Sequence, residues 1–190
     1  MQNRLFPDRD SARSCATADM VRVQDANGIV VNSAFDPALL RYDEFYDNEV
    51  AHSPAFRRHL GDVLGIVRRH LSGRIFEVGC GKGAFLERML EAGLDALGID
   101  PAYTGDRPEV LRKPFDASMN IVADGIVLRH TLEHVQEPVR FLEGIARANR
   151  GRGKIYIEVP CLDWILDHRA WFDIFYEHVN FFRLDDFRRL

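Results

Sequence analysis

The sequence predicts an α/β protein built on a doubly wound, mostly parallel sheet with helices on both faces. Three observations support this fold class. Short apolar runs alternate with helical patterns from Arg74 to Val159, a glycine-rich loop follows the first of these runs, and Asp100 ends the second. Because parallel strands require crossover connections that are usually helices, such alternation indicates a sheet that is covered on both sides.

The N-terminal residues 1–52 are expected to form an arm or flap outside that sheet. The first ~20 residues are polar and show no hydrophobic period, so they are expected to be disordered. Two short apolar runs, residues 21–24 and 29–31, flank the turn dipeptide Asn27-Gly28. This arrangement predicts a small β-hairpin.

A helix is predicted to begin at Ser53-Pro54, because serine caps a helix N-terminus and proline fits the first helical position. Ser72-Gly73 is expected to end it. The apolar residues of this segment fall on one helical face and are Phe56, Leu60, Val63, Leu64, Val67 and Leu71. The helix opens a domain of residues 53–190 and should pack on the sheet.

Five strands and further helices follow. The predicted strands cover residues 74–78, 94–99, 108–113, 123–129 and 154–159. One helix runs from Ala84 to Gly93, another begins near Pro138, and a last one begins near Leu184. Asp100 then lies at the carboxyl end of the second strand, the edge at which open α/β sheets bind ligands.

The chain is organised around one loop, Glu77-Val78-Gly79-Cys80-Gly81-Lys82-Gly83. Its three glycines lack a Cβ atom, so the loop can turn sharply and lie flat against a ligand. The backbone N–H groups at the start of the following helix are expected to face the same space. The sequence therefore predicts a site for a group that carries a carboxylate, a ribose or a phosphate.

One interpretation of this loop is a dinucleotide-binding site. Gly79, Gly81 and Ala84 satisfy the G-x-G-x-x-A spacing of a dinucleotide fingerprint, and Asp100 follows about 20 residues later, where an acid would bind a ribose. Glu77 argues against a nicotinamide cofactor, because such sites usually keep an apolar residue at that strand position. Another interpretation is a glycine-rich turn that binds no ligand.

Composition and charge describe an ordinary globular chain. It has 190 residues, a net charge of −4 and 46% hydrophobic residues, so no overall positive field would attract nucleic acid. No apolar run reaches the ~18 residues of a membrane span, and Cys15, Cys80 and Cys161 lie far apart. We therefore expect a cytoplasmic protein with no nucleic-acid or membrane partner, no disulfide framework and no metal site.

A set of motifs runs through the chain from Asn27 onward. It comprises the glycine loop, Asn32 to Pro37, Tyr42 to Asn48, His52 to Phe56, Gly98 to Pro101, Arg129 to His134, Ile157 to Pro160 and Phe175 to Phe182. Together these motifs resemble the class I S-adenosylmethionine-dependent methyltransferases of bacteria, in the branch related to sugar C-methyltransferases. Members of this branch often begin with a cysteine-paired zinc module, which is absent or degenerate here because only Cys15 lies in that region.

The resemblance implies a Rossmann-like fold and S-adenosylmethionine as the cofactor. It assigns cofactor binding to Glu77, Gly79, Cys80, Gly81, Asp100, Pro101, Arg129 and His130. Within this set the glycine loop would hold the methionine portion of the cofactor. Asp100 would accept hydrogen bonds from both ribose hydroxyls, since a carboxylate has two acceptor oxygens. Arg129 and His130 would line the methyl-donor pocket.

The implied reaction is methyl transfer to a small-molecule acceptor, such as an activated sugar or another metabolite. An acceptor that loses a proton needs a base, and the catalytic candidates are His178, Tyr176, Glu177 and His130. Packing of Tyr176-Glu177-His178 among the aromatic residues around it is also open. The alternatives to a methyltransferase are an NAD(P)-dependent oxidoreductase and a non-catalytic domain that binds a cofactor or a partner.

The resemblance also bears on the edge of the sheet. A methyltransferase sheet is expected to have two more strands than the five predicted here. The chain is therefore expected either to be truncated, lacking the last strands, or to have the edge of its fifth strand covered by a partner chain, for example in a homodimer.

Overall fold

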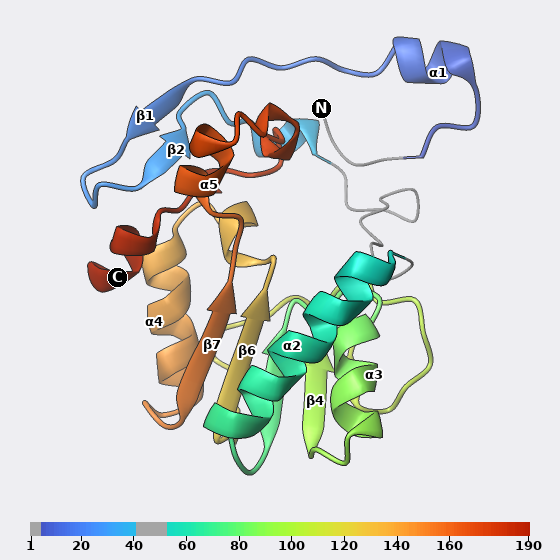
Figure 1. Ribbon diagram of the computed structural model, residues 1–190, viewed down its shortest axis with the longest axis vertical. Coiled ribbons are helices and arrows are strands. Elements are labelled where there is room, and N and C mark those ends of the chain that lie inside the picture. Colours follow the sequence, from blue (N-terminus) through green and yellow to red (C-terminus); the bar gives the residue numbers. More distant parts are fainter. Residues whose placement is uncertain (1–4, 41–52) are drawn as a thin grey trace. The chain divides into compact units, whose positions relative to one another are not determined.

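The computed structural model describes residues 5–40 and 53–190 (Figure 1). The contacts divide the chain into two compact units. The first unit comprises residues 1–48, 132–138 and 159–190, and the second comprises residues 49–131 and 139–158. This division differs from the boundary that the sequence analysis places after residue 52, because a C-terminal strand pairs with the N-terminal hairpin.

The second unit contains the predicted parallel sheet. Its strands are β3 (Ile75–Val78), β4 (Ala96–Ile99), β5 (Val110–Leu111), β6 (Gly125–Arg129) and β7 (Lys154–Glu158). All are parallel and stand in the order β5-β4-β3-β6-β7. This order confirms the Rossmann-like, doubly wound prediction. The winding reverses between β3 and β6, so the carboxyl ends of these two strands border the crevice in which such sheets bind ligands.

Two helices, α2 (Pro54–His70) and α3 (Ala84–Glu91), cover one face of this sheet (Figure 1). As predicted, Ser53 caps α2, and its hydroxyl oxygen accepts a hydrogen bond from Phe56 N at 3.4 Å. The buried cluster on this face contains Leu60, Val63, Val67 and Leu71 from α2 and its end, Phe85, Leu86 and Met89 from α3, and Ile75, Ala96 and Val127 from the strands.

A third helix, α4 (Pro138–Ala148), covers the opposite face. It buries Ile145 and Ala148 in a second cluster, which takes Phe76, Val78, Ile99, Ile126 and Leu128 from the strands. Because successive side chains of a strand point to opposite faces, neighbours such as Ile75 and Phe76 enter different clusters. Helices on both faces of the sheet are thus confirmed.

A buried asparagine joins the end of α4 to the sheet. The Oδ1 atom of Asn149 accepts a hydrogen bond from Ala123 N at 3.0 Å, and its Nδ2 atom donates to Ala123 O at 2.9 Å and to Arg152 O at 2.8 Å. Only 2% of Asn149 is exposed. One side chain therefore satisfies three backbone groups, of which the two of Ala123 are buried.

The first unit contains a three-stranded antiparallel sheet in the order β1-β2-β8. Strands β1 (Arg22–Gln24) and β2 (Val30–Asn32) form the predicted hairpin, in which Val23 lies opposite Val31. Strand β8 (Asn180–Phe181) adds to β2, with Phe181 opposite Val30. No strand is predicted at this position from the sequence. The segment is an aromatic cluster without the alternation of polar and apolar residues that indicates a strand.

Short helices complete the first unit. They are α1 (Arg9–Arg13), η1 (Pro37–Leu39), η2 (Leu132–His134), α5 (Leu162–Asp167), η3 (Trp171–Asp173) and η4 (Leu184–Arg188), where η denotes a 3₁₀ helix. Helix α1 lies within the N-terminal segment for which disorder is predicted from the sequence. It forms because the Asp8 carboxylate accepts a hydrogen bond from Ser11 N at 2.7 Å and so caps the helix.

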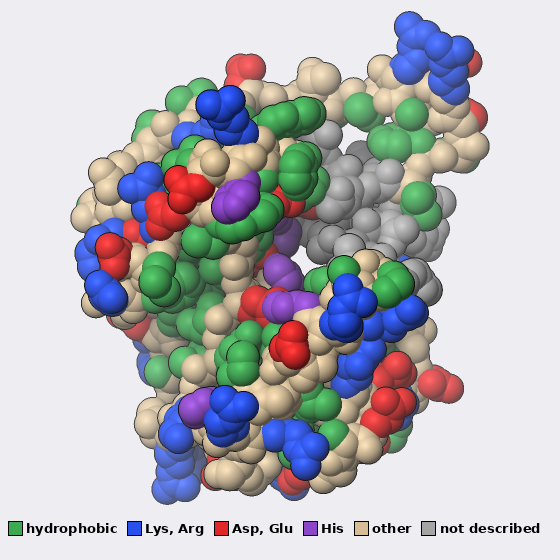
Figure 2. All heavy atoms as spheres, in the orientation of Figure 1, with side chains coloured by type: hydrophobic (Ala, Val, Ile, Leu, Met, Phe, Trp, Pro, Cys, Tyr) green, Lys and Arg blue, Asp and Glu red, His purple; other side chains and the backbone are tan. Residues whose placement is uncertain are grey.

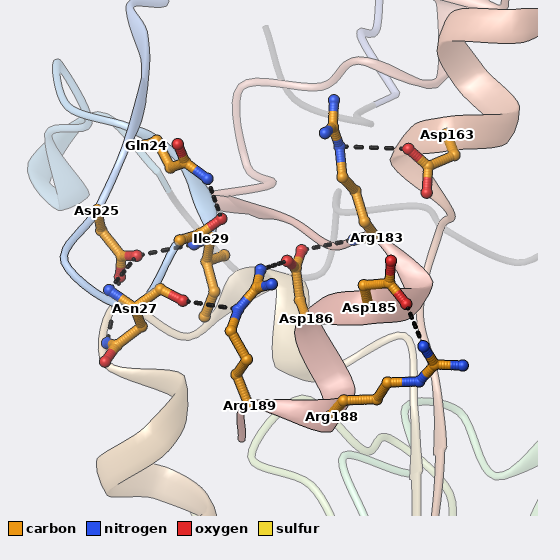
Figure 3. A network of polar contacts seen from close by, with 11 residues as sticks. Gln24, Asp25, Asn27, Ile29, Asp163, Arg183, Asp185, Asp186, Arg188 and Arg189 are labelled. Carbon is orange, nitrogen blue, oxygen red and sulfur yellow. Dashed lines mark hydrogen bonds and ion pairs between the residues drawn. The ribbon is translucent and has the colours of Figure 1, made fainter.

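A polar network ties η4 to the turn of the hairpin (Figure 3). The Arg189 Nε atom donates to Asn27 O at 3.1 Å, and the same guanidinium pairs with the buried carboxylate of Asp186. Gly28 has a φ of +83°, and a Cβ atom there would lie 3.1 Å from the Arg189 guanidinium. A glycine in the turn thus serves both the backbone conformation and this contact.

The surface carries charges of both signs. Figure 2 shows Lys and Arg side chains that stand among Asp and Glu side chains. Among residues 5–40 and 53–190, none of the helices has both the length and the apolar character that a bilayer span requires.

The Asn149→Ala substitution should destabilise the protein by about 2–4 kcal/mol, because it leaves the buried N–H and C=O groups of Ala123 unpaired and also removes the bond to Arg152 O. Urea unfolding followed by circular dichroism measures this loss. Asn120 is the matched control, since it is exposed and accepts only one hydrogen bond, from Arg150. Equal stability of the Asn149→Ala and Asn120→Ala variants would contradict the role assigned to Asn149.

Candidate functional site

The glycine loop follows β3 at the carboxyl edge of the sheet, where the sequence analysis places it. Gly79 has a φ of +78°, and a Cβ atom at this position would overlap the Thr131 hydroxyl group. That hydroxyl donates a hydrogen bond to Val78 O at 3.2 Å. Gly79 is therefore required so that the loop can pass beside Thr131, which follows the end of β6.

Gly81 marks the open side of the loop. Its φ is +56°, and a Cβ atom there would meet no described atom within 4 Å. By contrast, the Cβ position of Gly83 lies 3.2 Å from the Tyr103 ring. A ligand can therefore approach the loop backbone at Gly81, which lies between two glycines that are needed for internal packing.

Asp100 shapes the loop from the end of β4. Its Oδ2 atom accepts a hydrogen bond from Gly81 N at 2.8 Å, and its Oδ1 atom accepts one from Ala102 N, also at 2.8 Å. Because a carboxylate oxygen has two lone pairs, each oxygen keeps capacity for another donor. Pro101 lies in the exposed turn that these bonds stabilise.

The loop N–H groups serve this neighbouring strand. Gly79 N and Cys80 N both donate to Ile99 O, at 2.9 and 3.3 Å. The Cys80 side chain is buried, and its sulfur lies 2.8 Å from the Cβ position of Gly98. Burial raises the pKa of the Cys80 thiol, so this thiol is not reactive at neutral pH.

Glu77 is a carboxyl group inside the sheet, with 2% of its surface exposed. Burial raises its pKa to about 8, while the nearby Arg129 acts in the opposite direction. Among the described residues, its Oε2 atom has no hydrogen-bond partner. A buried oxygen of this kind suits a ligand that donates a hydrogen bond or carries a positive charge.

Glu158, at the end of β7, gathers three basic side chains. The Arg129 guanidinium donates to both carboxylate oxygens, from Nε at 2.8 Å and from the terminal nitrogen at 3.2 Å. Oε1 also lies 3.0 Å from His130 Nε2 and 2.6 Å from His59 Nε2. Although burial acts to raise the pKa of Glu158, the hydrogen bonds from His130 and Arg129 hold it well below its usual value.

Arg129 is held inside the second unit. Only 8% of it is exposed, and its guanidinium carbon lies 4.7 Å from the centre of the Phe85 ring and 5.9 Å from that of Phe56. The side chain thus stacks on two aromatic rings and pairs with Glu158. Its predicted contact with a cofactor stays a prediction.

His130 has a backbone conformation that is uncommon for a residue with a side chain. Its φ is +48°, in the left-handed region, immediately after the last residue of β6. Histidine tolerates this region better than most residues, and such strain is frequent at functional sites. The side chain is 35% exposed, so His130 combines a fixed ring with access to solvent.

The other predicted catalytic residues lie in the first unit. The Tyr176 hydroxyl accepts a hydrogen bond from Asp36 N at 2.8 Å and donates to Ala34 O at 3.4 Å. Tyr176, Glu177 and His178 are all buried. The hydroxyl of Tyr176 therefore holds the N-terminal arm, and its catalytic role stays a prediction. The predicted motifs at residues 42–48 and His52 lie outside the described residues.

Sequence reasoning missed Glu158 as a site residue. Glu158 is the penultimate residue of the fifth predicted strand, residues 154–159, and Arg129 is the last residue of the fourth. Parallel pairing brings these two residues directly side by side, a register that the sequence alone does not give. An acid and a base near the ends of consecutive predicted strands are therefore worth testing as a pair.

The chain is similar in sequence to known proteins. The chain matches the family described as "Methyltransferase domain" over residues 42–190. It is 29% identical over 126 residues to the C-methyltransferase NovU of Streptomyces niveus, covering 58% of this chain and 29% of that relative. The matched region is thus less than a third of the length of this relative.

Solved structures show the same fold. An S-adenosylmethionine-dependent methyltransferase from Archaeoglobus fulgidus superposes with a TM-score of 0.52 and 21% identity, covering 72% of this chain and 71% of that one. The plantazolicin methyltransferase BpumL, in complex with a triazolic desmethylPZN analogue and SAH, superposes with a TM-score of 0.51 and 19% identity. That match covers 73% of this chain and 62% of BpumL.

The Glu158→Ala substitution should cost about 3–5 kcal/mol of stability, because it leaves the buried Arg129 charge without a partner. Asp95→Ala is the matched control. It breaks the Arg74–Asp95 pair, whose side chains are 50% and 56% exposed, and should cost less than about 1 kcal/mol. Urea unfolding of both variants measures the difference, and similar losses would contradict the assignment.

Glu77 should make the protein less stable as pH rises. With a pKa of about 8 in the folded protein and an ordinary value of 4.5, Glu77 binds more protons in the folded state between these pH values. Stability from this group is therefore lost from about pH 4.5 to pH 8. The uncharged Glu77→Gln variant should lack that loss.

Melting temperatures of both proteins at pH 5, 6, 7 and 8 provide the measurement. The melting temperature of the variant relative to wild type should increase steadily with pH. Groups that both proteins share cancel in this difference. If the melting temperatures of the two proteins change with pH in the same way, Glu77 does not have the raised pKa.

Proposed function

The chain belongs to the methyltransferase domain family, and from this membership we propose that it transfers a methyl group from S-adenosylmethionine to a small-molecule acceptor. The relative NovU is described as a C-methyltransferase, and BpumL is described in complex with SAH, the demethylated form of this cofactor. The family match favours this function over the nicotinamide oxidoreductase, which Glu77 also disfavours.

The site fits the groups that S-adenosylmethionine would present. Its ribose carries two hydroxyls, for which the Asp100 oxygens have remaining lone pairs. Its ammonium group is a hydrogen-bond donor of the kind that suits Glu77 Oε2. The backbone at Gly81 is open to a ligand.

The observation that carries the proposal is the bond from Gly81 N to Asp100 Oδ2. This bond brings the open side of the glycine loop and the predicted ribose ligand to one point at the carboxyl edge of the sheet. When bound, S-adenosylmethionine supplies an electrophilic methyl group on sulfur. The task of the chain is then to orient the acceptor and to exclude water.

Among the predicted proton acceptors, His130 is best supported as a base for the acceptor. It belongs to the same unit as the glycine loop and Asp100, and it follows β6, the neighbour of β3. The carboxylate of Glu158 fixes its ring through Nε2. His178, Tyr176 and Glu177, in the first unit, stay predictions.

Isothermal titration of the purified chain with S-adenosylmethionine, SAH and NAD tests the proposal. We expect the two adenosyl ligands to bind and NAD not to bind. Asp100→Ala should weaken binding of both adenosyl ligands at least tenfold, because a lost hydrogen bond to a charged group is worth about 1.5–3 kcal/mol.

Asp106→Ala is the matched control, since Asp106 is an exposed aspartate of the same unit. It should leave binding unchanged. Circular dichroism of both variants establishes that they are folded. Binding of NAD in place of the adenosyl ligands, or equal affinity of Asp100→Ala and wild type for SAH, would overturn the proposal.

A further inference from the structure

The first unit contains a cluster of two histidines and a glutamate that the glycine-loop site does not use. Glu133 and His134 lie in η2, and His178 lies two residues before β8. One possible ligand atom from each residue lies within 4.8 Å of the other two. We propose that Glu133, His134 and His178 bind a divalent transition-metal ion, for which zinc is the best fit.

The fold brings these three side chains together through backbone contacts. Val179 N donates to Glu133 O at 2.8 Å, so the segment that carries His178 is attached to η2. The buried Asn180 side chain strengthens this attachment, because its Nδ2 atom donates to Leu132 O and Val135 O. These hydrogen bonds hold the segment of His178 against the segment of Glu133 and His134, so the cluster is preorganised.

A hydrogen bond determines which nitrogen of His134 can bind a metal. Nδ1 lies 3.0 Å from Glu177 O, and a carbonyl oxygen only accepts. Nδ1 of the neutral ring must therefore carry the proton, which leaves the lone pair on Nε2. Metal-binding histidines typically donate their other N–H to a carbonyl or carboxylate in this way.

His178 is buried beside two aromatic rings. It is 7% exposed, and its ring centre lies 5.2 Å from that of Phe175 and 5.0 Å from that of His134. The Glu133 carboxylate beside it is 1% exposed. One carboxylate and two imidazoles can together bind a divalent transition-metal ion.

The donor set favours zinc over calcium or magnesium. Imidazole nitrogen suits zinc and its neighbours in the periodic table, whereas the harder ions prefer sites made of oxygen. Donors about 2.1 Å from a tetrahedral zinc ion are about 3.4 Å apart. The candidate atoms here lie within 4.8 Å of one another, so binding requires side-chain movement that brings them closer. Three protein ligands leave a fourth position for water or for an oxygen of a bound molecule.

No metal site is predicted from the sequence, because its three cysteines lie far apart. The ligands proposed here come from two segments that are distant in the chain, so no local motif reveals them. The proposal does not depend on methyl transfer, and metal binding can be measured without any acceptor or cofactor.

Cobalt is the first probe. The purified chain, stripped of metal with a chelator, is titrated with Co²⁺ while the visible d–d absorption is recorded, and Zn²⁺ is then added as a competitor. We expect one Co²⁺ per chain with an intense tetrahedral spectrum, which Zn²⁺ abolishes. A thiolate-to-cobalt band would instead indicate binding by cysteine and would overturn the proposal.

Variants then identify the ligands. His134→Ala and His178→Ala should each weaken Co²⁺ binding at least tenfold. His168→Ala should leave it unchanged, because His168 is an exposed histidine of the same unit, stacked on Trp164. Glu133→Gln keeps the shape of the buried side chain and should also weaken binding.

Circular dichroism checks the fold of every variant, and His178→Gln replaces His178→Ala if the latter does not fold. Two results would overturn the proposal. One is a folded wild-type chain that binds no stoichiometric Co²⁺ or Zn²⁺, in which case the three residues form a hydrogen-bonded cluster only. The other is unchanged affinity in folded variants of both histidines.

Discussion

The pairing of Arg129 with Glu158 is the interaction on which the carboxyl edge of the sheet depends. Arg129 places a permanent charge among apolar side chains, and the partner that compensates it stands opposite on the adjacent strand. Since a buried charge without a partner is costly, neither residue can change alone. The same carboxylate contacts His59 of α2 and His130 after β6, so two strands and a helix meet at one group. The orientation of His130 is thus linked to the way in which Arg129 is neutralised.

The glycine loop is shaped by β4 before any ligand arrives. Its first N–H groups donate to Ile99 O, and Gly81 N donates to Asp100. A preformed loop lowers the entropic cost of ligand binding, because the loop does not have to be ordered on binding. Asp100, which we propose as an acceptor for the ligand, is thus also a support of the loop. If this proposal holds, binding and loop geometry are coupled through a single side chain. Glu77, the second carboxyl group of the proposed site, is more deeply buried.

The elements of the second unit could be predicted because their signals are local. Ser53-Pro54 caps α2, the glycines mark the turn after β3, and apolar runs identify the strands. What the sequence could not predict depends on pairs that are distant in the chain. The role of Glu158 follows from its register with Arg129, and the place of β8 follows from its pairing with β2. The hydrogen-bond acceptors of the loop N–H groups could not be predicted either. The glycine spacing predicts a sharp turn, but it does not show which oxygen atom accepts from each N–H group.

The assembly of the first unit from separate segments has a consequence for the order of folding during synthesis. The second unit is complete once β7 has been made, whereas β2 obtains its second neighbour only with Asn180 and Phe181. The contact of Arg189 with the hairpin turn forms later still. N-terminal segments emerge from the ribosome first. One edge of the hairpin is therefore unpaired while the parallel sheet folds. Until β8 has been made, that edge of β2 is open to pairing with strands of other chains.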